Sequence, residues 1–217
     1  MANIKIQSAV AGEVSSMLLK IGAIKLNANY PFTWSSGIKS PIYCDNRLAL
    51  SYPQVRTRVK KELVRLIQQF FPEAQGIGGV ATAGIPQGAL IADALELPFI
   101  YVRSSPKNHG MANLIEGKVT PSSKIVVVED LVSTGGSSLK AVDAIRDSGM
   151  EVLGMIAIFN YGFEVAEKNF LEADVNLFCL SDYDHLLKEA IKGNYIKQNE
   201  LDNLKSWREA PEVWNRV

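Results

Sequence analysis

The sequence lacks several features that mark common classes of protein. Lys plus Arg and Asp plus Glu both number 23, whereas proteins that bind nucleic acid or membrane surfaces usually carry a basic excess. The only cysteines, Cys44 and Cys179, show no CxxC spacing, so there is no zinc signature. The N-terminus does not resemble a signal peptide, and the longest apolar runs, such as 152–159, are too short to cross a bilayer. We therefore expect a cytoplasmic protein that binds neither nucleic acid nor membranes.

Internal repeats, low-complexity tracts and Pro/Ser-rich linkers are also missing. With 217 residues, of which 47% are hydrophobic, the chain is long enough for one domain with a sizeable core. Two well-known phosphate-binding patterns, GxxxxGK[ST] and a GxGxxG that follows a strand, do not occur. A phosphate site in this chain would need another design.

Apolar spacing predicts strands that alternate with helices. Residues 10–21 and 55–70 follow helical spacing, and the segments 76–80, 99–102, 124–128, 151–159 and 175–180 are typical of buried strands. We expect further helices from about 85, at about 138–148, after 181, and in the tail that holds Trp207 and Trp214, with Ser51 and Ser181 as caps of the helices that follow them. This alternation predicts an α/β fold, with a parallel sheet and helices on both faces.

Three connections follow strands of the predicted sheet, at 81–84, 103–121 and 129–137. In open parallel sheets, ligands bind beyond the carboxyl ends of the strands. The connection at 103–121 is long and polar, and structureless loops of that length in compact domains are often functional. We expect all three connections to meet at one crevice.

The connection at 129–137 has the composition of a sugar-phosphate site. Two acids, Glu129 and Asp130, are followed by Leu131 and Val132 and then by a turn of small residues that opens a helix, Ser133, Thr134, Gly135, Gly136 and Ser137. Glycines let the backbone approach an anion, and the free N–H groups at a helix start favour phosphate. The acids would accept hydrogen bonds from ribose hydroxyls. The alternative is a structural turn whose acids merely face solvent.

The other two connections suit a pyrophosphate. Arg103, Lys107 and His109 form a cationic cluster on the long loop, where they would stabilise charge on a leaving group. The turn of Ala81, Thr82, Ala83 and Gly84 would offer backbone N–H groups to the same anion. A solvated basic loop and a tight structural turn are the competing interpretations, and His185 is interpreted as a structural helix residue.

Three segments carry a family resemblance that extends over nearly the whole chain. Residues 125–137, IVVVEDLVSTGGS, match the general motif of the type I phosphoribosyltransferases. Residues 31–47, PFTWSSGIKSPIYCDNR, and 103–110, RSSPKNHG, resemble more narrowly the orotate-specific enzymes of that family. The first segment points to phosphoribosyl pyrophosphate (PRPP) as a ligand, and the other two point to orotate.

The resemblance implies a central parallel sheet flanked by helices, within one domain at 1–217. It implies a small hood over the base, mainly from residues 1–50, a core at about 51–180, and C-terminal helices at 181–217. It further implies a homodimer whose active sites are shared across the interface, and Mg²⁺ bound through the substrate, which Glu129 and Asp130 would reach through water. The implied reaction converts orotate and PRPP into orotidine 5′-monophosphate and pyrophosphate, in pyrimidine biosynthesis.

Carried over by position, the resemblance also assigns roles to single residues. Arg103, Lys107 and His109 would contact pyrophosphate, and Lys107 would matter most for the rate. Glu129 and Asp130 would hold the ribose hydroxyls, and 131–137 the 5′-phosphate. The base would lie near Ser133, Tyr43 and Cys44, although ordinary packing of a small subdomain also explains the last two.

Some positions depart from the family pattern. Some members carry Lys at the position of Ser35, and Tyr-Lys where this chain has Thr82-Ala83. Some carry Lys at the position of Ser104. Tyr161 stands where some members place an arginine that meets the orotate carboxylate, and Lys25, Lys39 or Arg47 could substitute for it.

Two alternative functions remain open, a purine phosphoribosyltransferase and a regulator that senses PRPP. Segment 31–47 argues against the first. Against the second stand the balanced charge and the lack of a spare N-terminal domain.

Overall fold

A central seven-stranded sheet organises the structure, a computed structural model that describes residues 3–34, 37–105 and 114–214. Its strand order is β1 (Ile4–Ile6), β11 (Leu177–Asp182), β10 (Glu151–Asn160), β9 (Lys124–Val132), β6 (Gly76–Val80), β7 (Phe99–Val102) and β8 (Ile115–Glu116). All neighbours pair in parallel except β7 and β8, which are antiparallel. The predicted α/β class is confirmed, and two of the predicted strands, 76–80 and 99–102, match to the residue.

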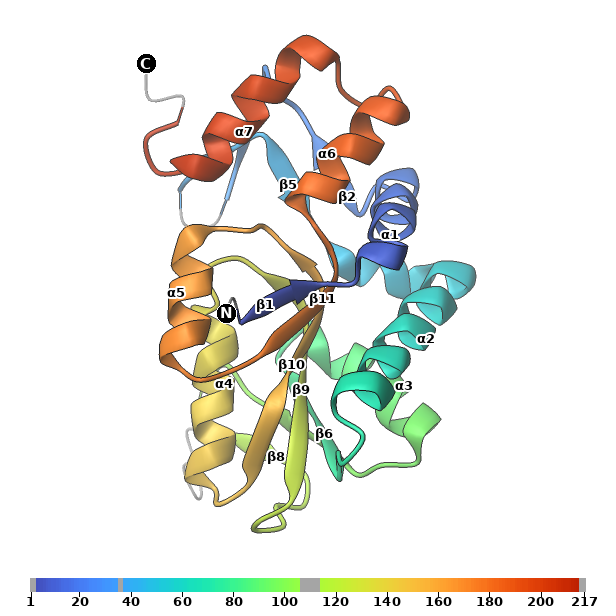
Figure 1. Cartoon of the computed structure of the whole chain (residues 1–217), viewed down its shortest axis with the longest axis vertical. Helices are drawn as coiled ribbons and strands as arrows, with labels where there is room; N and C mark the ends of the chain where they lie inside the picture. The colour runs from blue at the N-terminus through green and yellow to red at the C-terminus, as the bar shows by residue number, and fades with distance from the viewer. Residues whose placement is uncertain (1–2, 35–36, 106–113, 215–217) are drawn as a thin grey trace.

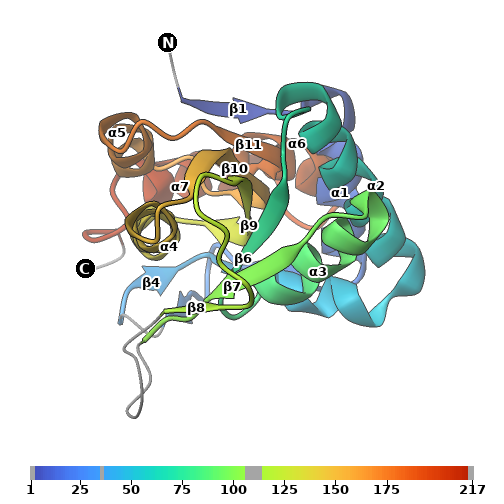
Figure 2. The same ribbon diagram turned by 90° about the horizontal axis from the view of Figure 1, so that it is seen from below.

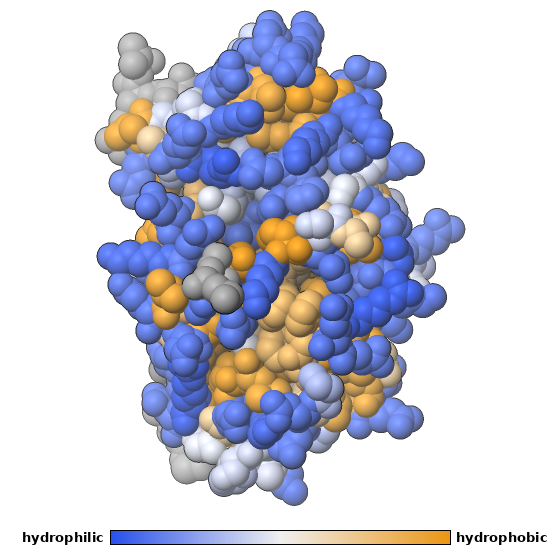
Figure 3. Space-filling view, viewed as in Figure 1, coloured by the Kyte–Doolittle hydropathy of each residue, from blue (hydrophilic) through white to orange (hydrophobic). Residues whose placement is uncertain are grey.

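Helices cover both faces of this sheet, as expected. On one face lie α1 (Ser8–Lys20), α2 (Pro53–Phe70) and α3 (Gly84–Leu95), and on the other lie α4 (Gly136–Asp147) and α5 (Glu164–Glu172) (Figures 1 and 2). Side chains of a strand alternate between its faces, so Val126 and Val128 of β9 enter one core while Val127 enters the other. Apolar side chains also reach the surface between the two helical layers (Figure 3).

A small subdomain, which we call the hood, lies beyond the end of the sheet. It holds two antiparallel pairs, β2 (Ile24–Leu26) with β5 (Ile42–Cys44) and β3 (Phe32–Thr33) with β4 (Lys39–Ser40). A 3-10 helix, η1 (Asn46–Ser51), connects it to α2. The hood is expected mainly from residues 1–50, and the first elements of that range, β1 and α1, lie at the central sheet. Strand β1 extends the central sheet beside β11 because its backbone pairs there, and α1 packs on β11 and α6.

The C-terminal segment completes the hood. Helix α6 (Tyr183–Lys192), the 3-10 helix η2 (Gln198–Glu200) and α7 (Leu201–Glu209) lie at the same end of the molecule as β2 and β5 (Figure 1). Asn203 of α7 donates a hydrogen bond of 3.2 Å to the backbone oxygen of Ala28. Trp207 is fully buried, and its ring centroid lies 5.7 Å from that of Trp34. None of the helices in the described ranges is long and apolar enough to cross a membrane.

Several local predictions were wrong. Tyr52, not Ser51, precedes α2 and offers no side-chain cap. Asp182, not Ser181, caps α6, since its carboxylate accepts from the backbone N–H of His185, whereas the Ser181 hydroxyl bonds to the backbone oxygen of Ala11. His185 is a helix residue, as predicted, whereas Trp214 lies in a turn beyond α7. The elements β1 to β5, η1, β8, α5 and η2 were not predicted.

Candidate active site

The site lies where the strand order reverses. Strand β6 is followed by β7 on one side, while β9 is followed by β10 and β11 on the other. The turns after β6 and β9 therefore lie side by side at the carboxyl ends of their strands, where ligands bind in open sheets. They line a cavity of about 300 Å³, the switch-point cavity, formed by Cys44, Asp45, Arg47, Ala81, Thr82, Ala83, Glu129, Asp130, Leu131 and Ser137. Two of the three predicted connections thus meet in one crevice.

Two glycines make this close approach feasible. A Cβ atom added at Gly84 would lie 2.3 Å from the backbone oxygen of Val128, so only glycine lets α3 begin against β9. Gly135 has a φ of +80°, and a Cβ there would lie 2.6 Å from the ring of Phe170. Glycine adopts such a backbone without steric cost. The bond between Ala81 and Thr82, in the turn after β6, is a cis peptide.

The start of α4 can hold an anion. The helix begins after Gly135 with no side-chain cap, and its first intrahelical bond runs from the Leu139 N–H to the Gly135 oxygen. The N–H groups of residues 136–138 precede that bond, and the positive end of the helix dipole lies with them. Ser137 lines the switch-point cavity. A phosphate group fits this end of the helix.

The sequence suggested that Glu129 and Asp130 lie in a turn. They lie instead in strand β9, which continues to Val132 beside β10. Glu129 is 6% exposed, and its carboxylate accepts hydrogen bonds from the Ser138 hydroxyl and the Asp130 N–H, both at 3.0 Å. Burial raises the pKa of Glu129 well above its ordinary range, and the charge of Asp130 raises it further. Burial also raises the pKa of Asp130, against the opposing effects of Glu129 and Arg47. Two desolvated acids in one cavity favour a ligand with hydroxyl donors or positive charge.

A second cavity, the hood cavity, adjoins the first. It measures about 690 Å³ and is lined by Thr33, Trp34, Ile38, Tyr43, Cys44, Leu131, Ser133, Thr134 and Tyr161. Cys44 and Leu131 line both cavities, which makes the two spaces neighbours. Rings of Trp34 and Tyr161 lie 5.3 Å apart between centroids. Aromatic walls with a few hydroxyls suit a flat, polar heterocycle.

Asn46 joins the hood to the sheet and was not predicted. Its side chain is fully buried and donates a hydrogen bond of 2.8 Å to the backbone oxygen of Asp130. The Cys44 thiol lies 3.3 Å from the Asn46 amide oxygen. Burial, followed by the charges of Asp130 and Asp45, raises the pKa of that thiol, so it stays protonated. Asn46 lies inside the segment 31–47, which carries the family resemblance. That membership was the only sign in the sequence that Asn46 belongs to the site.

The remaining predicted residues have different places. Val132 is buried in the core, so its side chain cannot touch a ligand. Arg103 follows β7, and its guanidinium lies 3.5 Å from the carboxylate of Glu116. Lys107 and His109 lie outside the described residues. Within the described ranges, no group of three or more His, Cys, Asp or Glu side chains could hold a metal ion.

The arrangement can hold a sugar phosphate between two cavities. The phosphate would lie at the start of α4, the sugar hydroxyls near Glu129 and Asp130, and a flat ring in the hood cavity. The turn of Ala81, Thr82 and Ala83 would face a second anionic group from the opposite wall. This geometry suits a reaction at the sugar carbon that faces the hood.

Comparisons with known proteins agree with this chemistry. Residues 53–185 match the family model described as "Phosphoribosyl transferase domain". The chain is 58% identical over 204 residues to the orotate phosphoribosyltransferase of Cytophaga hutchinsonii, which covers 94% of this chain and 98% of that protein. It is 56% identical to the enzyme of that name from Porphyromonas gingivalis, over 93% of this chain and 96% of that protein. The crystal structure of orotate phosphoribosyltransferase from Aeropyrum pernix superposes with a TM-score of 0.71 at 27% identity, over 85% of this chain and 99% of that one.

Proposed function

The chain belongs to the phosphoribosyltransferase family, among its orotate phosphoribosyltransferases, and we propose that it transfers the phosphoribosyl group of PRPP to orotate. The products are orotidine 5′-monophosphate and pyrophosphate, in the biosynthesis of pyrimidines. The observation that carries the proposal is the junction of the switch-point cavity with the hood cavity at Cys44 and Leu131. At this junction the sugar and the base would meet.

Each wall of the switch-point cavity would bind one part of PRPP. The 5′-phosphate would take the free N–H groups at the start of α4 and the hydroxyls of Ser133, Thr134 and Ser137. The ribose hydroxyls would donate to Glu129 and Asp130. The pyrophosphate would lie along the turn of residues 81–83. This placement leaves the anomeric carbon of the ribose facing the hood cavity.

The buried acids also favour the transition state. Bond breaking at the anomeric carbon leaves positive charge on the ribose and negative charge on the departing pyrophosphate. Glu129 is 6% exposed and lies against the charge of Asp130, so positive charge beside the pair relieves their repulsion. Such stabilisation is stronger in the transition state than with bound PRPP, which is the condition for catalysis.

We also propose that Mg²⁺ accompanies PRPP. The pair of Glu129 and Asp130 offers carboxylate oxygens, which Mg²⁺ prefers, and the ion usually keeps several waters and binds through substrate phosphates. An ion held by the pyrophosphate and the ribose hydroxyls would reach these two acids through water. When bound, it would neutralise charge on the pyrophosphate.

The loop and the oligomer rest on the resemblance. We propose that Arg103, Lys107 and His109 contact the pyrophosphate and that the loop completes the site of a second subunit in a homodimer. Arg103 stands at the beginning of this loop beside Glu116. A cytoplasmic location stays a prediction from the sequence.

The test of the proposed function is a comparison of bases. The purified protein is incubated with PRPP, Mg²⁺ and one of orotate, uracil, adenine, guanine or hypoxanthine, and nucleotides are separated by chromatography. Orotate should yield orotidine 5′-monophosphate, and the purines should yield nothing. A purine consumed as fast as orotate would contradict the assignment of the base and leave the fold intact.

A further inference from the structure

The hood cavity lacks an obvious partner for one group of its proposed ligand. Orotate carries a carboxylate, which is ionised at neutral pH. Among the described residues, the side chains that line the hood cavity, from Thr33 to Tyr161, are all uncharged types. Tyr161, where a cation would be expected, is 2% exposed, and burial raises the pKa of its hydroxyl well above the ordinary range, so that it stays neutral. A cation that binds the carboxylate would reach it from outside this lining.

Lys39 is placed to do so. It is the direct cross-strand partner of Thr33 in the β3–β4 pair, and its ammonium donates a hydrogen bond of 2.8 Å to the Thr33 hydroxyl. Thr33 itself lines the hood cavity. An ammonium group has three N–H donors, and Thr33 takes one. The charge of Lys39 therefore lies one hydrogen bond from the cavity.

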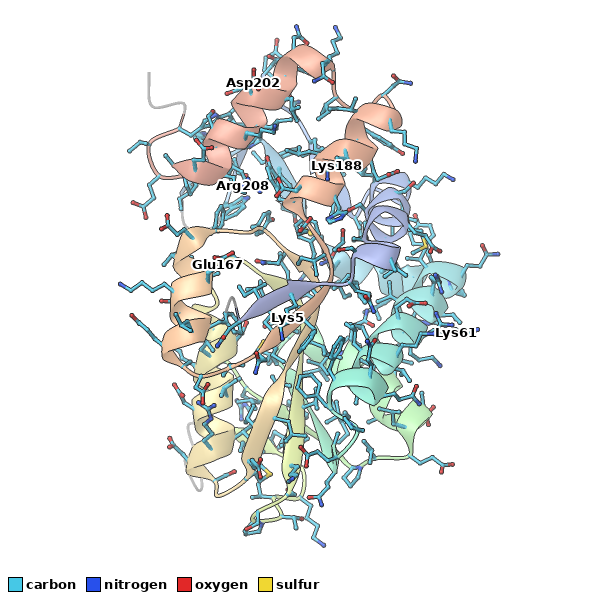
Figure 4. All side chains as sticks on the ribbon, viewed as in Figure 1. Lys5, Lys61, Glu167, Lys188, Asp202 and Arg208 are labelled. Atoms are coloured by element: carbon cyan, nitrogen blue, oxygen red, sulfur yellow. The ribbon has the colours of Figure 1, made fainter. Side chains whose placement is uncertain are left out.

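Three other cations near the hood have different positions or partners. Arg47 makes a two-pronged ion pair with Asp45, at 2.6 and 2.9 Å, and lines the switch-point cavity. Arg208, labelled in Figure 4, pairs with Asp184 at 2.7 Å and lies over the Tyr183 ring. The stem of Lys25 extends back toward Gly22 in the turn after α1, since its Cε lies 3.9 Å from where a Cβ of Gly22 would be.

We propose that Lys39, positioned by Thr33, binds the carboxylate of orotate and so sets the preference of this enzyme for an acidic base. The inference rests on the proposed function. Because Lys39 is exposed, solvent screens its charge, and its contribution is that of a moderate charged hydrogen bond.

The test compares orotate with orotamide, in which the carboxylate is replaced by a neutral amide of nearly the same shape. Values of kcat/KM are measured for both bases with wild type, Lys39→Met and Lys39→Arg. Lys39→Met should lower kcat/KM for orotate about tenfold, mainly through KM, and leave orotamide nearly unchanged. Lys39→Arg should keep most of the discrimination, because it keeps the charge.

Two further variants control for loss of charge. Lys61→Met removes an exposed charge from α2, distant from the hood (Figure 4), and should leave the orotate to orotamide ratio at the wild-type value. Lys25→Met should also leave that ratio unchanged. If Lys39→Met lowers kcat/KM equally for orotate and orotamide, the role of Lys39 is refuted. It is also refuted if Lys25→Met removes the discrimination between the two bases instead. A wild-type protein that makes no nucleotide from orotate would refute the proposed function itself, which is a different result.

Discussion

Asn46 of the hood donates its side-chain N–H to the backbone oxygen of Asp130, at 2.8 Å, within the central sheet. The two residues are 84 positions apart in the chain, and Asn46 is fully buried. Asp130 lines the switch-point cavity. Cys44, two residues before Asn46, lines both cavities. This bond therefore fixes the position of the hood relative to the acids.

Replacement of Asn46 by Ala should therefore affect both stability and binding. The change leaves the Asp130 oxygen without its partner, which costs about 1–3 kcal/mol of unfolding free energy, and it loosens the junction of the two cavities. We expect weaker binding of both PRPP and orotate, measured by calorimetry. Asn29→Ala, which removes an exposed bond to Glu200, is the matched control and should be almost neutral. Unchanged affinities in a destabilised Asn46→Ala protein would show that the bond is only structural.

The buried carboxyl group of Glu129 should give the protein an unusual dependence of stability on pH. Its pKa is raised in the folded protein, so the folded state holds the proton more tightly than the unfolded state does. The unfolding free energy should fall as pH rises from the ordinary carboxyl range, about 4.3, through the raised pKa. Glu129→Gln cannot ionise, and its stability relative to wild type should increase over the same interval.

Denaturant titrations at pH 4 and at pH 8 check this expectation. Glu167→Gln, on the exposed side of α5 (Figure 4), is the control and should follow wild type at both values. A Glu129→Gln protein that is less stable than wild type at pH 8, by more than at pH 4, would mean that the carboxylate is stabilised in its ionised form.

The sequence predicted the sheet better than the hood, for physical reasons. Runs such as 124–128 are apolar because both faces of a central parallel strand are buried, so the pattern alone identifies them. The end of strand β9 could not be predicted, because Glu129 and Asp130 are polar but still pair with β10. The hood strands have two or three residues each, too short for any period to show.

The candidate site was predicted in part. The turn after β9 and the turn after β6 were found from small residues and acids, and they do share a cavity. Asn46 and Lys39 make long-range or cross-strand contacts, which single-sequence patterns do not contain. The sequence offered three cations for the orotate carboxylate, and only their contacts in the fold distinguish them.

Trp207 should matter for the base more than for PRPP. It lies outside the matched residues 53–185, but its ring packs 5.7 Å from Trp34 and 5.8 Å from Tyr161, both of which line the hood cavity. Its indole N–H has no hydrogen-bond partner among the described residues, so Trp207→Phe loses packing only. Trp207→Ala should cost about 3–5 kcal/mol.

The measurement is a pair of Michaelis constants for the Trp207→Phe protein, which should stay folded. The KM for orotate should rise severalfold, while the KM for PRPP should change little. Equal changes in both constants would mean that α7 supports the whole domain rather than the hood cavity.

The proposed shared site can be tested by mixing inactive subunits. Lys107→Ala should lower kcat by roughly 100-fold or more, on the scale of one lost charge stabiliser, while substrate binding suffers less. Mixing it with a Glu129→Gln, Asp130→Asn subunit should restore activity, because one site of each heterodimer then has an intact loop and intact acids. Random exchange would return at most about a quarter of wild-type activity. Heterodimers verified by mass spectrometry that stay inactive would show that each loop serves its own subunit.

The stoichiometry of a single reaction tests the central claim most directly. With PRPP and Mg²⁺ in excess, orotate loss, orotidine 5′-monophosphate gain and pyrophosphate release are measured together for wild type and for the Glu129→Gln, Asp130→Asn double variant. We predict equal amounts of all three for wild type, and a large loss of rate in a double variant that remains folded. Pyrophosphate released by wild type without orotate consumption, or a folded double variant with unchanged rate and PRPP affinity, would contradict the account.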